Sequence, residues 1–129
     1  MLARGEFEVT LEPLEPYYPG SGGNKLGRLS IGKTFTGDLE GESRGEMLTA
    51  LTSTEGSAGY VAIEQVDGTL HGLRGGFVLQ HFGVASGGQN RLVLEVVPGS
   101  GTGELAGISG TMAIEIEGSK HFYELSYEV

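Results

Sequence analysis

The sequence predicts an all-β protein, and three observations lead to that class. Glycine occurs 24 times in 129 residues, whereas about 7% of a chain is usual. Every window of about 12 residues contains Gly or Pro, or alternates apolar and polar residues with the two-residue period of a strand. Turn sequences such as SGGQN and PGSGTG separate these segments. Because an interior glycine costs a helix about 1 kcal/mol relative to alanine, an α-rich fold is not expected.

Alternation and turn residues together define eight segments. Residues 6–11 alternate strictly, and residues 26–35 place Leu29, Ile31 and Phe35 on one face of a strand. Asp67-Gly68 is a strong signal for a two-residue hairpin turn, so the segments on either side of it are expected to pair. The predicted strands are 6–11, 26–35, 39–51, 58–66, 69–83, 91–97, 108–117 and 121–129.

The connections between these segments are short, and a strand lies near each end of the chain. Consecutive strands with short connections pair in antiparallel fashion, and an even number of them can close into a barrel without exposed edges. The sequence therefore predicts an eight-stranded antiparallel β-barrel formed as a single domain by residues 1–129. An open sandwich is the alternative arrangement of the same strands.

Composition excludes several partners. The net charge is −9, from 17 acidic and 8 basic residues, so a phosphate backbone or an anionic membrane would be repelled. No segment approaches the roughly 20 apolar residues that span a bilayer, and the N-terminal residues alternate rather than form a signal peptide. Without cysteine there is no disulfide or thiolate site. We expect a cytoplasmic protein with no nucleic-acid or membrane partner.

Three middle segments are apolar on both faces, namely 60–63, 77–79 and 92–94. An isolated small barrel alternates apolar interior residues with polar exterior ones. Runs that are apolar on both faces occur in strands that are buried on both sides. No helix is available to cover the outer face, so we expect a homo-oligomer, with scattered exposed apolar residues as the alternative explanation.

Two nucleotide-binding patterns occur in the wrong context. Residues 27–34, GRLSIGKT, match the phosphate-loop pattern letter for letter. The pattern requires a buried strand before it and a helix after it, whereas PYYPGSGGNKL and FTGDLEGES flank it. Residues 101–106, GTGELA, match a dinucleotide-binding pattern, but no βαβ unit fits in the 23 residues that follow. We expect no nucleotide and no other cofactor.

Metal and triad sites have equally little support. The histidines, His71, His81 and His121, are far apart and lack zinc-motif spacing. A Ser-His-Asp triad would need one of the two aspartates, Asp38 and Asp67, and both stand in turn sequences. No metal site is predicted.

Five ionisable residues are the candidates for a ligand pocket. Most of them interrupt apolar runs, and a carboxylate that faces a barrel interior has a raised pKa suited to acid–base chemistry. His81 is the best placed, since its strand phase matches Phe77 and Leu79. The alternative is that the carboxylates point outward and pair with Arg44, Arg74 or Arg91. The candidates are Glu46, Glu64, His81, Glu95 and Glu104.

Lys33 is the least expected residue of the second segment. It shares the strand face of Leu29, Ile31 and Phe35, which are predicted core positions. A lysine in that phase either reaches past the barrel rim to water or meets a carboxylate. Glu46, on the next segment, is a possible partner.

Four stretches of the chain resemble an uncharacterised, mostly bacterial family of domains of unknown function with an allene-oxide-cyclase-like barrel. They are GDLEGESRGEML (37–48), GSAGYVAIEQVDGTLHG (56–72), GGFVLQHFG (75–83) and VVPGSGTGELAGISG (96–110). The resemblance covers nearly the whole chain and implies an eight-stranded antiparallel β-barrel, allene-oxide-cyclase-like, rather than a sandwich. It implies no reaction and no catalytic residue.

The function expected from these observations is the binding of a small, partly apolar molecule in or at the mouth of the barrel, since barrels of this size hold at most one small ligand. One alternative is an isomerase or cyclase that uses a pocket carboxylate or His81 as acid–base catalyst. Another is a structural oligomeric module with a filled interior.

Overall fold

The computed structural model describes all 129 residues and is entirely β, without helices. It confirms the predicted class and replaces the eight expected segments with eight long strands and one very short one. The strands are β1 Leu2–Leu14, β2 Lys25–Gly37, β3 Leu39–Leu51, β4 Ala58–Leu70, β5 Leu73–Ser86, β6 Gln89–Val96, β7 Thr102–Gly103, β8 Ser109–Glu117 and β9 Lys120–Glu128. No helix is present that could cross a membrane.

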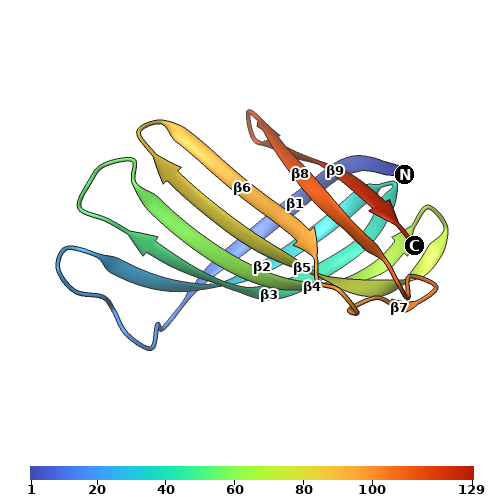
Figure 1. Cartoon of the computed structure of the whole chain (residues 1–129), viewed down its shortest axis with the longest axis horizontal. Coiled ribbons are helices and arrows are strands. Elements are labelled where there is room, and N and C mark those ends of the chain that lie inside the picture. Colours follow the sequence, from blue (N-terminus) through green and yellow to red (C-terminus); the bar gives the residue numbers. More distant parts are fainter.

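The strands form one antiparallel sheet that closes on itself. Neighbours run in the order β4-β3-β2-β1-β9-β8-β6-β5, and β5 pairs in turn with β4 to close the ring. The seam between β6 and β8 is the narrowest pairing, with a single register pair, Glu95 to Thr111. Four hairpin loops lie at one end of the barrel, which we call the mouth, while both chain termini lie at the other, the closed end (Figure 1).

The hairpin between β4 and β5 differs from the prediction. Asp67 and Gly68 do not form the turn but stand inside the ladder, opposite Gly76 and Gly75. The chain turns instead at His71 and Gly72, whose φ angles of 47° and 80° are both left-handed, as a type I′ turn requires. The longer hairpin is favoured because it carries Leu70 into the core, where it is completely buried.

The segment after β6 supports the half of β5 that β6 does not reach. Backbone N–H groups of β5 donate to the side chains of Ser100, Thr102 and Glu104, at 3.0, 3.0 and 3.1 Å. The glycine-rich stretch GTGELA is therefore a connection between strands, as its sequence context predicts, and it contributes the two-residue β7. Leu105, in the same segment, is fully buried in the core at the closed end.

The interior of the closed end is filled by side chains. A cluster of 16 buried residues occupies it, and its aromatic rings pack edge to face, with the centroids of Phe35 and Tyr123 5.6 Å apart at 84°. The Tyr123 hydroxyl accepts from the N–H of Leu39 and donates to the carbonyl of Thr36, both at 2.9 Å. A buried tyrosine hydroxyl needs such partners, and Tyr123 finds them on the backbone of β2 and β3.

Candidate functional site

Three ionisable side chains lie inside the barrel, above the filled core. Lys33 from β2, Glu64 from β4 and His81 from β5 are 5%, 0% and 3% exposed. The Lys33 ammonium donates to Glu64 Oε2 at 2.9 Å, and His81 Nε2 makes a short hydrogen bond to the same oxygen. An ionised carboxylate only accepts hydrogen bonds, so His81 Nε2 carries the proton. We call these three residues the interior cluster.

Strand alternation alone places each member of the cluster inside. Glu64 lies opposite Leu79 on β5 and opposite Gly45 on β3. His81 follows Leu79 by two residues, so both side chains face the interior. A Cβ atom at Gly45 would come within 1.8 Å of the Ile63 carbonyl, so β3 and β4 can approach closely only because this position beside Glu64 is a glycine.

The charge of Glu64 is strongly stabilised despite its burial. Desolvation alone would raise the pKa of Glu64, but the hydrogen bond from His81 and the charge of Lys33 outweigh it and lower the pKa to about 2. One carboxylate oxygen nevertheless has no donor, since Glu64 Oε1 is buried without a hydrogen-bond partner. The hydroxyl of Ser43, which lies opposite Lys33 in the ladder, is also buried and unpartnered. Buried polar atoms of this kind are uncommon and costly.

Aromatic rings cover the ammonium group of Lys33. Its Nζ lies 4.8 Å from the ring centroid of Phe7 and 5.9 Å from that of Phe35. Both distances allow cation–π attraction, which strengthens when the cation is removed from water. Phe7 also packs against His121, with centroids 5.2 Å apart. Lys33 is thus held by one carboxylate and two rings, which offsets part of the cost of its burial.

Tyr60 joins the interior cluster to the mouth. Its ring centroid lies 6.3 Å from that of His81, and desolvation together with the negative charge of Glu64 raises the pKa of its phenol. The ring lies over Gly83, its partner on β5, where a Cβ would come within 2.4 Å of the tyrosine carbon atoms. Glycine at 83 is therefore what allows Tyr60 to occupy this position.

An open cavity of about 440 Å³ lies at the mouth, next to the cluster. Five strands contribute to it, and its wall is mostly apolar. Its volume is within the range of ligand pockets, about 300–1,000 Å³. Its lining includes Met47, Thr49, Leu51, Tyr60, Leu92 and Ile116.

Of the five candidates predicted from sequence, the structure brings together only Glu64 and His81. Glu46 lies opposite Ile63 on the outer surface and pairs with Arg28 at 2.6 Å, so it is neither the partner of Lys33 nor part of the interior. Glu95 is exposed opposite Gln80. The exposed Glu104 accepts from the N–H of Arg74. For Glu46 and Glu95 the reason is strand phase, since each stands one residue out of register with the interior-facing positions.

Two residues of the site were missed by sequence reasoning, and the partner of Lys33 was misassigned. Tyr60 was noted only within an apolar run, although its phase matches that of Glu64, four residues later. Ser43 gives no sequence signal, since a small polar residue on a strand fits either face. The alternation of Leu29, Ile31 and Phe35 did signal the inward position of Lys33.

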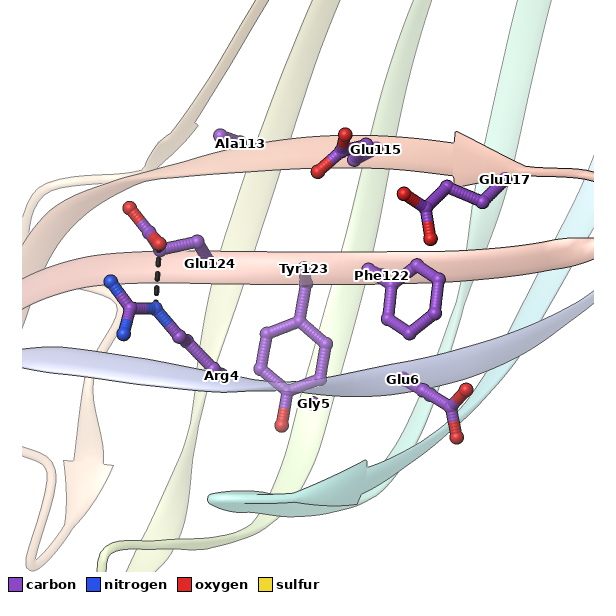
Figure 2. A pocket seen from close by; sticks show the side chains of 9 residues that line it. All are labelled: Arg4, Gly5, Glu6, Ala113, Glu115, Glu117, Phe122, Tyr123 and Glu124. Atoms are coloured by element: carbon purple, nitrogen blue, oxygen red, sulfur yellow. Dashed lines mark hydrogen bonds and ion pairs between the residues drawn. The ribbon is translucent and has the colours of Figure 1, made fainter.

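A second depression, of about 510 Å³, lies on the outer surface of β1, β8 and β9 (Figure 2). Tyr123 and Gly5 lie at its base, with Phe122 beside them. Four glutamates and one arginine line it, and Arg4 is already paired with Glu124 at 2.7 Å. Because its carboxylates are hydrated and repel one another, this surface offers no recognition comparable to that of the interior cluster.

No group of three or more His, Asp or Glu side chains is arranged to hold a metal ion. The functional groups of the site are a carboxylate, an imidazole, an ammonium and a phenol. Such a set can donate and accept hydrogen bonds at a buried position and can exchange protons with a molecule in the mouth.

Comparison with known proteins agrees with the geometry. The family of proteins of unknown function DUF3224 matches residues 3–127. The chain belongs to the DUF3224 family. A solved structure of a DUF3224 protein of unknown function from Shewanella oneidensis MR-1 is 58% identical, with a TM-score of 0.96, and the match covers 99% of this chain and 96% of that one. None of the curated proteins is significantly similar to the chain. Membership in DUF3224 thus supports the barrel and leaves the biochemical activity to be argued from the site.

Proposed function

We propose that this DUF3224 protein binds a small, partly apolar molecule in the mouth of its barrel, with the polar end of the molecule toward the interior cluster. The single observation that carries the proposal is the buried cluster itself, placed beside an open apolar cavity. A buried ion pair is poor at adding stability compared with apolar residues of similar volume. Its presence, with Glu64 Oε1 lacking a donor, is better explained by recognition of a ligand.

The arrangement of apolar and polar side chains around the cavity suggests the form of the ligand. Met47, Leu51, Leu92 and Ile116 offer an apolar wall, while Tyr60 marks the side of the cavity nearest the cluster. An apolar body with one hydrogen-bonding group fits this arrangement. Mostly apolar pockets with a few placed polar groups are the usual form of small-molecule sites.

Native mass spectrometry of the protein purified from its own host tests the proposal directly. We expect a bound molecule of fixed mass that is released on denaturation. In parallel, fluorescence titration with 8-anilinonaphthalene-1-sulfonate and with the uncharged N-phenyl-1-naphthylamine compares the wild type with Ile116→Glu in the mouth. Leu2→Glu is the control, since Leu2 is a similarly exposed apolar residue, 48% against 63%, on the outside of β1.

The expected result is that Ile116→Glu weakens binding of the uncharged probe about tenfold or more, while Leu2→Glu leaves it unchanged. Binding that survives Ile116→Glu but is lost in Phe82→Glu, on the outer surface, would place the probe outside the barrel and contradict the proposal.

A second candidate is an isomerase or cyclase, favoured by the hydrogen-bonded pair of Glu64 and His81 with Tyr60 beside it. These groups could remove a proton at one carbon of the bound molecule and return it at another. The molecule recovered from the host protein would then be converted by fresh protein to a species of equal mass and different chromatographic retention. Unchanged retention would leave binding as the function, whereas conversion that persists in His81→Gln would show that His81 is not the acid–base catalyst.

The proposal includes two further points. We infer that the fold is allene-oxide-cyclase-like, which the eight closed antiparallel strands support and a strand-by-strand superposition would test. We also infer a cytoplasmic location, as expected from the sequence, which cell fractionation would test.

A further inference from the structure

The outer surface of four adjacent strands carries an apolar face. Leu48, Val61, Phe82 and Val93 are successive cross-strand partners on β3, β4, β5 and β6. They are between 42% and 55% exposed. In the neighbouring outward-facing rows, Ile63 lies toward the closed end and Val84 toward the mouth. Ile63 and Val84 are 49% and 37% exposed. We call these six residues the outer apolar face.

This face differs from the rest of the surface in charge. Across the barrel, the outer surface of β1, β8 and β9 carries the glutamates of Figure 2. A chain with a net charge of −9 is repelled by its own copies wherever such surfaces meet. The outer apolar face has no charged side chain at its centre. Tyr17 and Tyr18, in the loop after β1, extend it and line a groove with Leu48 and Phe82; exposed tyrosines are typical of protein interfaces.

The outer apolar face is bordered by a positive side chain on the mouth side and by a negative side chain on the closed-end side. Arg91 lies in the row of Val84, on the mouth side, and its guanidinium lies 5.4 Å from the ring centroid of Phe82. Glu95, on the same strand, lies in the row of Gln80 and Ile63, on the other side. On β6, a positive group therefore lies on one side of the outer apolar face and a negative group on the other.

We propose that two copies of this chain associate through their outer apolar faces, around a two-fold axis that runs along the central row from Leu48 to Val93. This axis reverses the strand direction in the second copy and packs the two sheets face to face, an arrangement common for sheets. Arg91 of each copy then lies over Glu95 of the other, and symmetry forms the pair twice. An axis parallel to the strands would instead bring Glu95 toward Glu46 of the second copy, which like-charge repulsion disfavours.

A specific interface buries about 800 Å² on each partner, from about 20–30 residues. The six apolar residues form its centre, and Arg91, Glu95, Tyr17 and Tyr18 belong to its rim. The exposed pair of Arg28 on β2 with Glu46 on β3, at 2.6 Å, borders the face on its β2 side. The interface thus has an apolar centre and a charged rim, the usual anatomy of protein contacts.

Sedimentation equilibrium of the full chain, from micromolar to millimolar concentration, tests the proposal. The wild type is expected to reach the dimer mass, and Phe82→Glu to remain monomeric, while Leu2→Glu, on the outside of β1, dimerises as the wild type does. Circular dichroism verifies that each variant keeps the β fold. A wild type that remains monomeric at every concentration, or a dimer that persists in Phe82→Glu, would overturn the proposal.

Charge reversal tests the position of the axis. Arg91→Glu places two carboxylates together and Glu95→Arg two guanidinium groups, so each single variant should raise the dimer dissociation constant by at least about tenfold. The double variant restores opposite charges and should return the constant to within about threefold of the wild type. Additive loss in the double variant would show that the two residues do not meet and would overturn this arrangement.

Discussion

The two ends of the barrel interior are built from the same alternating strands and differ in what the inward positions hold. At the closed end they hold large apolar side chains, and every polar atom of Tyr123 is satisfied. Toward the mouth they hold a lysine, a glutamate and a histidine, and one carboxylate oxygen has no partner. The closed end follows the rules of a stable core, whereas the mouth end departs from them. Such departures are expected where a protein binds or reacts.

The largest effect should come from breaking the closed end. Phe77 is fully buried, and Phe77→Ala should lower the free energy of unfolding by about 3–5 kcal/mol, measured by urea denaturation. Ile116→Ala, at the mouth, removes a side chain that is 63% exposed and should cost less than about 1 kcal/mol. Equal losses in the two variants would mean that the mouth is as tightly packed as the core.

Disrupting the interior cluster should lower the free energy of unfolding nearly as much, for a different reason. Glu64→Gln leaves the Lys33 ammonium buried without its counter-charge and should lower the free energy of unfolding by about 3–5 kcal/mol. Replacing the whole cluster, with Lys33→Met, Glu64→Leu and His81→Phe together, should recover most of that loss and still abolish probe binding in the mouth. A triple variant that stays as unstable as Glu64→Gln would indicate that the cluster serves the fold rather than a ligand.

Acid should act selectively on the mouth end. Because the folded-state pKa of Glu64 is lowered from 4.5 to about 2, its ionisation stabilises the fold above the unfolded pKa, and this contribution is lost as the pH falls from about 4.5 to 2. It amounts to about 3 kcal/mol. The difference in unfolding free energy between wild type and Glu64→Gln, followed by urea denaturation from pH 7 to pH 2, should shrink across that interval. A constant difference would show that Glu64 is not ionised in the fold.

A smaller effect should follow from displacing Tyr60. The methyl group of Gly83→Ala would overlap the Tyr60 ring and move it, at a cost of about 1–3 kcal/mol. Spectrophotometric titration should then show one phenol with a pKa closer to its ordinary value, since the ring leaves the surroundings of Glu64. Tyr60→Phe identifies that phenol in the wild type, and an unchanged titration would mean that the ring has not moved.

The smallest effect is expected from the outer carboxylates. The pair of Arg28 with Glu46 is exposed, so Glu46→Gln should leave both the stability of the fold and probe binding nearly unaltered. Glu95→Gln is the matched substitution at the other outward glutamate. Weaker probe binding in either variant would indicate that the substituted glutamate contributes to the ligand pocket.

How far the sequence predicted the structure can be judged from single strands. The segment 39–51 was predicted with the bounds that β3 has, because alternation and the turn before it agree. The pairing of the segments on either side of Asp67-Gly68 was confirmed, but the turn was placed wrongly, because a local turn signal competes with pairing that extends to Leu70 and Leu73. For the site, strand phase indicated the inward positions of His81 and Lys33, and the interruption of an apolar run indicated Glu64. Glu46 was the possible partner considered for Lys33, whereas the ammonium donates to Glu64, two strands away.

Taken by itself, the sequence determined the class of fold and the faces of the strands, because glycine content and a two-residue period are local properties of a chain. Only the tertiary structure decided that Lys33, Glu64 and His81, from three different strands, meet at one oxygen atom. The stagger between β2, β4 and β5 sets that meeting, and stagger arises from the closure of the whole barrel. The same closure gathered an apolar face whose neighbours in space are far apart in the chain.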